Sequence, residues 1–424
     1  MIQNSFKYTF LVVLYTFFSS CQAQQPREKS TSPNKIEIDG TVYNQQDINS
    51  EDTHIAKEII LGAEQSELYL PQLKDKNVGV ITNQTGIIPA NHSQHLVDYL
   101  LDQKIKVKRI FAPEHGFRGE ADAGETVKDG IDTQTGLPII SLYGKNKKPY
   151  DSQISDLDVL VFDIQDVGVR FYTYISTLHY VMEAAAENNI PVIVLDRPNP
   201  NAHYIDGPIL EASQKTFVGM HPVPIVYGMT IGEYAQMING EKWLKNRVTC
   251  DLTIVPLKNY THDTVYDLPV KPSPNLPNAQ SINLYPSLCF FEGTNVSEGR
   301  GTEMQFQIYG SPYLKDMAFK FTPKPNKGAK NPQHNGKLCY GEDLRNYPRL
   351  SEIKLNWLIK AYKNNTQQPF FTKNAGAFWL DKLAGTDDLR KQIENGWSEE
   401  KIKATWKDGL EKFKNIRGKY LLYP

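Results

Sequence analysis

Between residues 77 and 196 the chain repeats one pattern: a short apolar run rich in β-branched residues, then a longer stretch with the spacing of an amphipathic helix. The apolar runs are continuous and do not alternate with polar residues. Such runs are typical of parallel strands buried on both faces of a sheet. Five of them are predicted as strands: NVGVIT (77–82), VKRIFA (107–112), PIISLY (138–143), DVLVFDI (158–164) and PVIVLD (191–196).

The order strand, helix, strand predicts βαβ units, and therefore an α/β fold with a Rossmann-like, doubly wound, mainly parallel sheet. In many such sheets a G-x-G-x-x-G motif after the first strand binds a dinucleotide. That motif does not follow the first strand here. We therefore predict no cofactor.

A chain of 424 residues is too long for a single core, so two domains are expected. The Pro-rich stretch 268–287 is predicted to be extended and to connect them. Residues 22–57 are polar and have the composition of a linker. We predict a Rossmann-like catalytic domain over residues 58–287 and a smaller α/β domain over residues 288–424 that completes the cleft.

The first residues have the pattern of a secretory signal. Lys7 precedes an apolar run, residues 8–18, that is too short to span a bilayer. Two serines before Cys21 resemble a bacterial lipobox, which makes residues 1–21 a signal peptide and Cys21 the site of a lipid anchor. The alternative is soluble export with cleavage after Ala23. We expect an exported, periplasmic protein that meets a membrane only through the lipid on Cys21.

Charge and cysteine content exclude several classes of protein. A formal net charge of -1 gives no broad attraction to nucleic acid or to anionic lipid, so no nucleic-acid partner is expected. Cys250, Cys289 and Cys339 are far apart in the sequence, which excludes a disulfide framework and favours buried thiols.

The sequence gives little support for a metal site or for a serine nucleophile. The nine histidines show no H-E-x-x-H spacing, so zinc would need ligands from separate loops, such as Glu114, His115, Asp163 and Asp196. A G-x-S-x-G elbow for a serine nucleophile is also missing from the sequence. We predict no metal site.

Polar side chains follow the predicted strands where each strand ends. In an open parallel sheet these carboxyl ends border the ligand crevice. Any one of them could be a helix cap or a loop residue, but the ends of neighbouring strands converge in space. The candidates are Asn83, Glu114, His115, Arg118, Asp163, Gln165, Arg170, Tyr172, Tyr174, Asp196, Arg197 and Asn199.

Glu114 is the strongest candidate for chemistry. It follows an apolar strand between Pro113 and Phe117, so partial desolvation is expected to favour the protonated form, which can donate a proton near neutral pH. His115 and Arg118 could orient this carboxyl group or bind an anion. The alternative is a glutamate that only accepts a hydrogen bond from the backbone or from His115.

Two further clusters carry charge. The segment FDIQDVGVRFYTY places carboxylates beside aromatic rings, a combination that suits the hydroxyls and C–H faces of sugars, although its tyrosines could equally belong to the core. The Gly-rich segment 291–303 contains Glu292, Glu298, Arg300 and Glu303, and its glycines allow the backbone to approach a ligand closely.

Together, five motifs resemble the NamZ-like exo-β-N-acetylmuramidases, glycoside hydrolase family 171. The likeness runs in order from about Gly79 to the C-terminus. It implies an exported enzyme that releases terminal N-acetylmuramic acid from the non-reducing ends of peptidoglycan fragments, in a cleft between a Rossmann-like domain and a smaller one. It also places the family's catalytic glutamate on Glu114. The motifs are APEHGFRGE, FDIQDVGVRFYTY, LDRPNP, EGTNVSEGRGT and WKDGLEKFKNIRGKYLLY.

This substrate carries a lactyl carboxylate, which a bidentate Arg is suited to bind. Arg300 and Arg170 are the preferred candidates, with Arg118 and Arg197 as alternatives.

Glycosidic cleavage also needs a group besides the acid, acting as nucleophile, base or charge stabiliser. We expect Asp163 first, then Glu292 or Glu303, while the acetamido group of the substrate could itself attack. Two other functions fit the same features: a periplasmic lipoprotein that binds muramic-acid sugars without cutting them, and a metal-dependent amidohydrolase.

Overall fold

The computed structural model describes residues 35–38, 41–44, 58–118 and 128–424. Strands β1 (Lys35–Ile38) and β2 (Thr41–Asn44) pair as an antiparallel hairpin. Residues 58–424 form one compact unit. The predicted signal peptide with Cys21 lies outside the described residues, as does most of the predicted linker.

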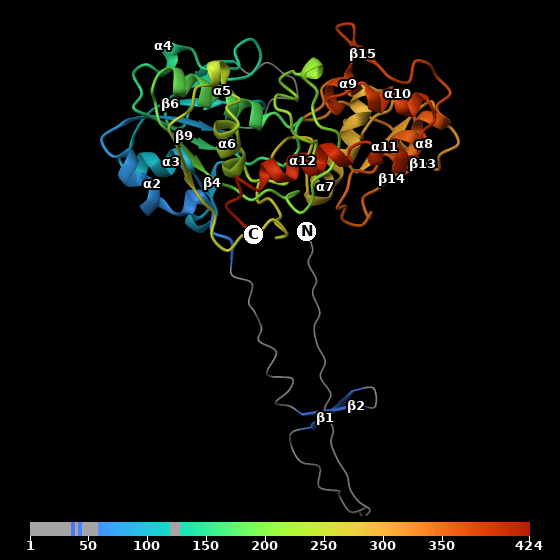
Figure 1. Ribbon diagram of the computed structural model, residues 1–424, viewed down its shortest axis with the longest axis horizontal. Helices are drawn as coiled ribbons and strands as arrows, with labels where there is room; N and C mark the ends of the chain where they lie inside the picture. The colour runs from blue at the N-terminus through green and yellow to red at the C-terminus, as the bar shows by residue number, and fades with distance from the viewer. Residues whose placement is uncertain (1–34, 39–40, 45–57, 119–127) are drawn as a thin grey trace, which may run out of the picture. The chain divides into compact units, whose positions relative to one another are not determined.

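The main sheet has seven strands in the order β11-β10-β9-β3-β6-β8-β7. Figure 1 labels two of them, β6 and β9. All neighbouring pairs are parallel except β7 and β8. The chain winds outward from β3 in one direction and from β9 in the other, which confirms the doubly wound, mainly parallel sheet. The strands are β3 (Asn77–Thr82), β6 (Lys106–Ala112), β7 (Gly130–Ile131), β8 (Pro138–Ser141), β9 (Val159–Asp163), β10 (Val192–Leu195) and β11 (Leu252–Val255).

Helices cover both faces of this sheet. Val159 and Val161 of β9 pack with α2 and α3, while Leu160 and Phe162, on the opposite face of the same strand, pack with α5 and α6. Both faces of each central strand are therefore buried, which explains the continuous apolar runs. The helices are α2 (Ser66–Leu73), α3 (Leu96–Asp102), α5 (Tyr174–Glu187) and α6 (Ile231–Gly240), with the short α4 (Asp151–Ile154) before β9.

The C-terminal part is built on a smaller antiparallel sheet in the order β12-β14-β13. Helices α8 to α12 follow it in the chain, and a two-stranded hairpin of β15 and β16 precedes α9. Its elements are β12 (Ile308–Ser311), β13 (Phe319–Phe321), β14 (Cys339–Asp343), α8 (Asn356–Asn364), β15 (Lys373–Asn374), β16 (Ala377–Phe378), α9 (Trp379–Ala384), α10 (Asp388–Glu394), α11 (Glu399–Ala404) and α12 (Lys407–Arg417).

The connection between these parts differs from the prediction. Residues 268–278 are irregular, but α7 (Ala279–Leu288) is helical, followed by the 3-10 turn η5 (Cys289–Gly293). Asn278 caps α7 by accepting a hydrogen bond from the amide of Ser281 at 2.9 Å. Pro286 has no N–H for the carbonyl of Ile282, and Asn201 Nδ2 donates to that carbonyl at 3.1 Å instead. A proline inside a helix is stable here because a distant side chain replaces the lost hydrogen bond.

Arg170 ties the two parts together. It is fully buried and donates hydrogen bonds to the carbonyls of Pro208 at 2.8 Å and Val223 at 2.6 Å. The same guanidinium donates to Leu383 at 3.2 Å and Ala384 at 2.6 Å, at the end of α9. Burial lowers the pKa of Arg170 to about 9, which still leaves it charged at neutral pH. One cation therefore holds backbone from both sides of the molecule.

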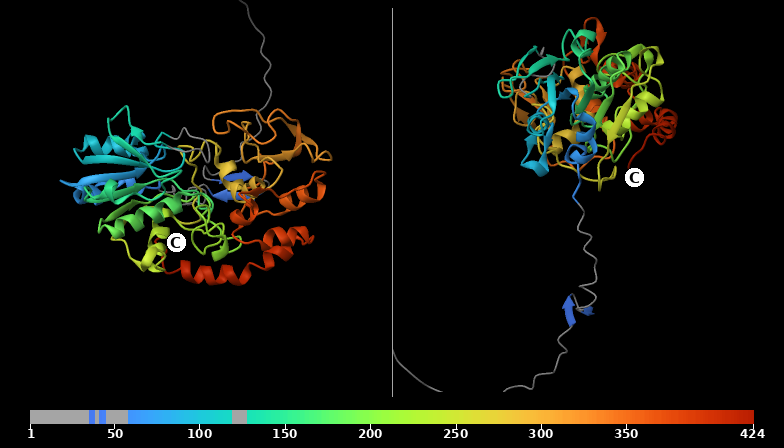
Figure 2. Two further views of the ribbon diagram at one scale, coloured as in Figure 1. Left: turned by 90° about the horizontal axis from the view of Figure 1, so that it is seen from above. Right: turned by 90° about the vertical axis from the view of Figure 1, so that its left-hand side faces the viewer.

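The C-terminal segment returns to the main sheet, and Figure 2 shows α12, in red, running back from the C-terminal part. Arg417 Nε donates to the carbonyl of Gly228 at 2.8 Å. Tyr423 donates its hydroxyl to Asp196 Oδ2 at 2.6 Å, directly after β10. The two parts are thus connected a second time.

Replacing Arg170 by Met should destabilise the fold strongly, because it leaves buried carbonyl groups without donors. We expect the free energy of unfolding to fall by at least about 3 kcal/mol, measured by urea denaturation. Arg345→Met is the matched control, since Arg345 pairs with Asp343 at the surface and its loss should leave stability unchanged. Equal stability of the two variants would contradict the role assigned to Arg170.

Candidate active site

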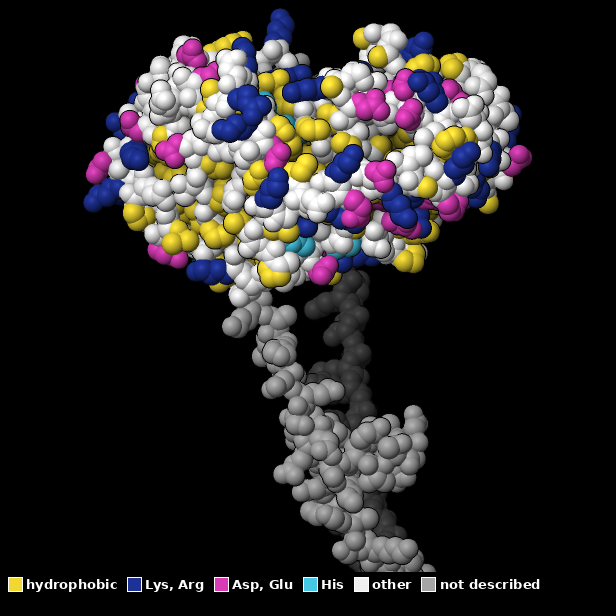
Figure 3. All heavy atoms as spheres, in the orientation of Figure 1, with side chains coloured by type: hydrophobic (Ala, Val, Ile, Leu, Met, Phe, Trp, Pro, Cys, Tyr) yellow, Lys and Arg dark blue, Asp and Glu magenta, His cyan; other side chains and the backbone are white. Residues whose placement is uncertain are grey.

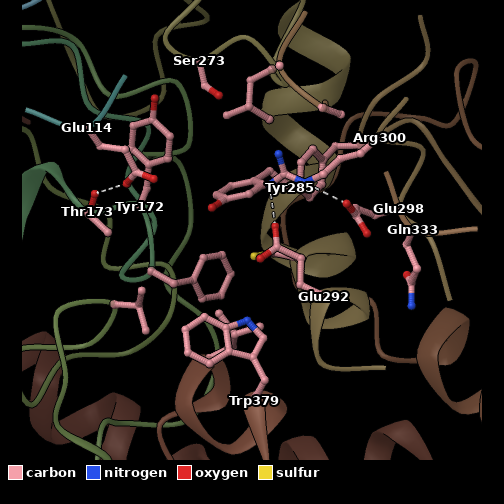
Figure 4. A pocket seen from close by; sticks show the side chains of 18 of the residues that line it. Glu114, Tyr172, Thr173, Ser273, Tyr285, Glu292, Glu298, Arg300, Gln333 and Trp379 are labelled. Carbon is pink, nitrogen blue, oxygen red and sulfur yellow. Dashed lines mark hydrogen bonds and ion pairs between the residues drawn. The ribbon is translucent and has the colours of Figure 1, made fainter. Parts of the chain in front are cut away.

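A pocket of about 900 Å³ lies between the carboxyl ends of the main-sheet strands and the C-terminal part (Figure 4). One wall comes from the segments after β6, β8 and β9, and the other from η5 and the loop that follows it. On the face drawn in Figure 3, acidic and basic side chains are interspersed.

Glu114 stands on the wall formed by the sheet. The segment after β6 turns sharply, because the amide of Gly116 bonds to the carbonyl of Pro113 at 3.0 Å and His115 and Gly116 both have positive φ. This turn directs the half-buried Glu114 into the pocket, where Thr173 Oγ1 donates to Glu114 Oε2 at 2.7 Å. Burial, then the charge of Glu114 and a hydrogen bond to it, raise the pKa of Tyr143 beside it.

The opposite wall carries a charge cluster of three residues, Glu292, Glu298 and Arg300, which we call the Arg300 cluster. Arg300 Nη2 lies 2.7 Å from Glu292 Oε1, and Arg300 Nε lies 2.8 Å from Glu298 Oε1. The guanidinium also lies 5.1 Å from the centre of the Phe306 ring. In Figure 4, Glu292 projects into the pocket from the side opposite Glu114. Two carboxyl groups therefore border the same space.

The pKa values of Glu298 and Arg300 in the Arg300 cluster both lie above their ordinary values. Burial raises the pKa of Glu298 to about 7; Arg300 lowers it and Glu292 raises it. Burial lowers the pKa of Arg300, but Glu292 and Glu298 outweigh this and leave it above its ordinary value. Arg300 is therefore a permanent cation, while Glu298 can hold a proton near neutral pH.

Aromatic side chains line much of the remaining surface of the pocket. The ring of Tyr285 packs edge-on against Phe171 at 5.3 Å and against Phe306 at 4.9 Å. Tyr172 and Trp379 also line the pocket. Rings beside hydrogen-bonding groups form the surface that pyranose sugars require, with C–H faces on the rings and hydroxyls on the polar groups.

Five of the residues proposed from the sequence line this pocket together: Glu114, His115, Tyr172, Glu292 and Arg300. The other ten are not among the described residues that line it. Most of them are buried and support the walls from within the fold. They are Asn83, Arg118, Asp163, Gln165, Arg170, Tyr174, Asp196, Arg197, Asn199 and Glu303.

Asp163, expected as the second catalytic group, forms a buried ion pair instead. Arg197 Nε donates to Asp163 Oδ1 at 2.6 Å and Arg197 Nη2 donates to Asp163 Oδ2 at 2.9 Å. Both side chains are almost completely inaccessible to solvent. Each charge neutralises the other next to the switch point between β3 and β9, so the carboxylate of Asp163 does not face the pocket.

Arg170, one of the two preferred groups for a substrate carboxylate, uses its guanidinium to hold four backbone carbonyls and cannot also hold a ligand. Arg118 is 40% exposed and pairs with Asp132 at 2.8 Å. Glu303 is exposed. Of the arginines considered from the sequence, Arg300 is the one on the pocket wall.

The remaining candidates hold the backbone of the wall. Asn83 Nδ2 donates to the hydroxyl of Tyr174 at 2.8 Å, and that hydroxyl donates to the carbonyl of Pro272 at 3.3 Å. Asp196 accepts hydrogen bonds from Tyr423, Thr230 and Gly232. Gln165 Nε2 donates to the carbonyl of Pro198 at 2.6 Å, and Asn199 Nδ2 donates to that of Met229 at 2.9 Å. These side chains shape the site without facing it.

Several pocket residues were missed as site candidates in the sequence. Glu298, in the Gly-rich segment with Glu292, and Tyr143, at the end of the predicted third strand, both belong to patterns seen in the sequence but were not selected as site residues. Tyr285 and Trp379 come from separate helices and carry no local signal.

Within the described ranges, no group of three or more His, Cys, Asp or Glu side chains could hold a metal ion. The same part of the chain contains no helix long and apolar enough to cross a membrane. Cys250, Cys289 and Cys339 are buried free thiols, as the sequence predicted.

Comparison with known proteins identifies relatives over nearly the whole compact unit. The family model for the N-terminal part of the exo-β-N-acetylmuramidase NamZ matches residues 78–280, and the model for its C-terminal part matches residues 283–423. The peptidoglycan β-N-acetylmuramidase NamZ of Bacillus subtilis is 42% identical over 381 residues, which cover 84% of this chain and 89% of that protein.

Two solved structures have the same architecture. Both are proteins of the DUF1343 family from Bacteroides fragilis, and each comparison covers 86% of this chain and 99% of the other. One is 47% identical with a TM-score of 0.79, and the second is 29% identical with a TM-score of 0.74.

The structural role of Asp163 can be tested with Asp163→Asn. The substitution leaves Arg197 buried without its counter-charge, so the free energy of unfolding should fall by about 3–5 kcal/mol. At a temperature where the variant is still folded, as judged by circular dichroism, kcat should stay within about tenfold of the wild-type value, well short of the loss of a general acid or base. A thousandfold loss of kcat at unchanged stability would instead make Asp163 a catalytic residue.

Proposed function

Because the chain belongs to the NamZ family of exo-β-N-acetylmuramidases, it is a glycoside hydrolase of peptidoglycan, and we propose that Glu114 and Glu292 perform its chemistry. The observation that carries this assignment is their placement on opposite walls of the same aromatic pocket. A lipoprotein that only binds sugar, or a metal-dependent amidohydrolase, has no support from these relatives.

The substrate is a peptidoglycan fragment that ends in N-acetylmuramic acid at its non-reducing end. A pocket of about 900 Å³ lies at the upper end of the range found for ligand sites, roughly 300–1,000 Å³, and has room for more than one sugar ring. The terminal sugar lies with its C–H faces against rings such as Tyr285 and Trp379. The pocket therefore takes the end of a chain together with the linkage to be cut.

In this assignment Glu114 is the general acid. It gives its proton to the glycosidic oxygen as the bond from that oxygen to the anomeric carbon breaks, so the next sugar leaves as an alcohol. The hydroxyl of Thr173 donates to Glu114 Oε2 and so helps to fix the orientation of the carboxyl group in the pocket. Water supplies a hydroxyl group to the anomeric carbon and returns a proton to Glu114.

Glu292 acts on the other side of the sugar. Its charge stabilises the positive charge that develops at the anomeric carbon and the ring oxygen in the transition state. The ion pair with Arg300 keeps this carboxylate in one position, so little reorganisation is needed during the reaction.

These two roles predict different responses to the leaving group. Glu114→Gln should lower kcat about 1,000-fold with a natural saccharide but only slightly with a dinitrophenyl glycoside, which departs without a proton. Glu292→Gln should lower kcat strongly with both substrates. Binding of free N-acetylmuramic acid, measured by calorimetry, should survive in Glu114→Gln. Equal losses with both substrates in Glu114→Gln would contradict its role as the acid.

We further propose that the protein is exported to the periplasm and anchored by a lipid on Cys21. The support is the charged start, the short apolar run 8–18 and the small residues before Cys21. The substrate class agrees with this location, because peptidoglycan lies outside the cytoplasmic membrane. Residues 22–57 would then tether the compact unit to the membrane surface.

Labelling with a fatty acid tests the anchor. In a bacterial host with lipoprotein processing, the wild type should incorporate labelled palmitate and sediment with membranes, whereas Cys21→Ala should do neither. Cys250→Ala is the matched control, because it removes a buried thiol and should keep the label. An unlabelled wild type whose mature N-terminus begins after Ala23 would indicate soluble export instead.

A further inference from the structure

We propose that Glu298, acting through Arg300, sets the net charge of the pocket wall and so determines the pH range in which the site binds an anionic sugar. This inference rests on the proposed function, since N-acetylmuramic acid carries a lactyl carboxylate. In this role Glu298 does not take part in the reaction itself. It acts as a positioning residue that changes the charge beside the bound sugar.

The geometry gives Arg300 two competing partners. Glu292 and Glu298 each accept one hydrogen bond from the guanidinium, through Nη2 and Nε. The two carboxyl groups differ in exposure: the side chain of Glu298 is 5% exposed and that of Glu292 is 25% exposed. Glu292 therefore meets the substrate, while Glu298 lies deeper and acts on it through Arg300.

The backbone keeps this arrangement in place. The carbonyl of Glu298 accepts from the amide of Phe306 at 2.8 Å, and Gly299 follows with a φ of 88°. A side chain at Gly299 would meet the carbonyl of Met304 at 2.8 Å, so the turn also depends on glycine there. The backbone of Glu298 is therefore held beside Arg300 by this loop.

The charge of the cluster depends on one proton. With both glutamates ionised, Arg300 balances only one of them and the wall carries one net negative charge. With Glu298 protonated, the wall is neutral. The other groups packed against the cluster are Tyr285 from α7 and Cys289 from η5, and burial raises the pKa of both, so they stay neutral at neutral pH.

Glu298 changes its charge near neutral pH. Its pKa is raised by burial to about 7, so the protonated form prevails below that pH and the ionised form above it. A carboxylate ligand should therefore bind better below about pH 7 and meet repulsion above it. Glu114, His115 and Lys330 also line the pocket, so their contribution must be separated by experiment.

Calorimetric titration with two free sugars makes this separation. For the wild type, the Kd of N-acetylmuramic acid should rise about fivefold from pH 6 to pH 8, as expected for one added charge at several ångströms in a partly wet site. The Kd of neutral N-acetylglucosamine should not change with pH. In Glu298→Gln the rise for N-acetylmuramic acid should disappear.

Glu399→Gln is the control for the loss of a buried glutamate, because Glu399 is buried in α11 and outside the pocket lining. It should keep the wild-type pH dependence. The inference is overturned if Glu298→Gln keeps the rise in Kd. If Glu298→Gln does not fold, the wild-type titrations alone test the inference. It is then overturned if the Kd values of the two sugars depend on pH in the same way. Failure of the wild type to bind either sugar would overturn the proposed function itself.

Discussion

The site depends on one buried cation. Arg170 donates hydrogen bonds to backbone carbonyls from the main-sheet part and from the end of α9, and the proposed catalytic groups lie on the walls that these two parts supply. Transition-state stabilisation requires reacting groups to be placed within a fraction of an ångström. A cleft between two packed parts achieves this only if their relative position is fixed, and Arg170 fixes it at the interface, with the Tyr423 to Asp196 hydrogen bond as a second connection.

The polar residues around the strand ends form two groups, one paired inside the fold and one facing the pocket. Those inside the fold are neutralised by a partner, as Asp163 is by Arg197, and contribute a rigid frame. Those on the pocket surface, such as Glu114, lie where a ligand can reach them. The Arg300 cluster combines both features, since Glu292 meets the pocket while Glu298 is buried behind it.

The sequence predicted the main sheet well because its strands are buried on both faces. Such burial requires continuous runs of apolar residues. The sequence also placed Glu114, because a carboxyl group directly after such a strand stands out. The sequence could not show that Glu114 faces the pocket while Asp163 does not, since both follow buried strands. Asp163 has a structural role only because Arg197, from the next strand end, pairs with it.

Glu292 and Arg300 were found because they are close in sequence. Tyr285 and Trp379 were not found, because they lie in distant segments that folding brings to the pocket. The helix that contains Pro286 was not predicted either, because it depends on a hydrogen bond from Asn201 in another segment.

The central claim is that the scissile linkage lies between Glu114 and the Arg300 cluster. A crystal structure of Glu114→Gln with a disaccharide that ends in N-acetylmuramic acid tests this most directly. The glycosidic oxygen should lie about 3 Å from the side-chain amide of residue 114, with the anomeric carbon facing Glu292. A linkage bound elsewhere, or separated from residue 114 by more than one water molecule, would contradict the account.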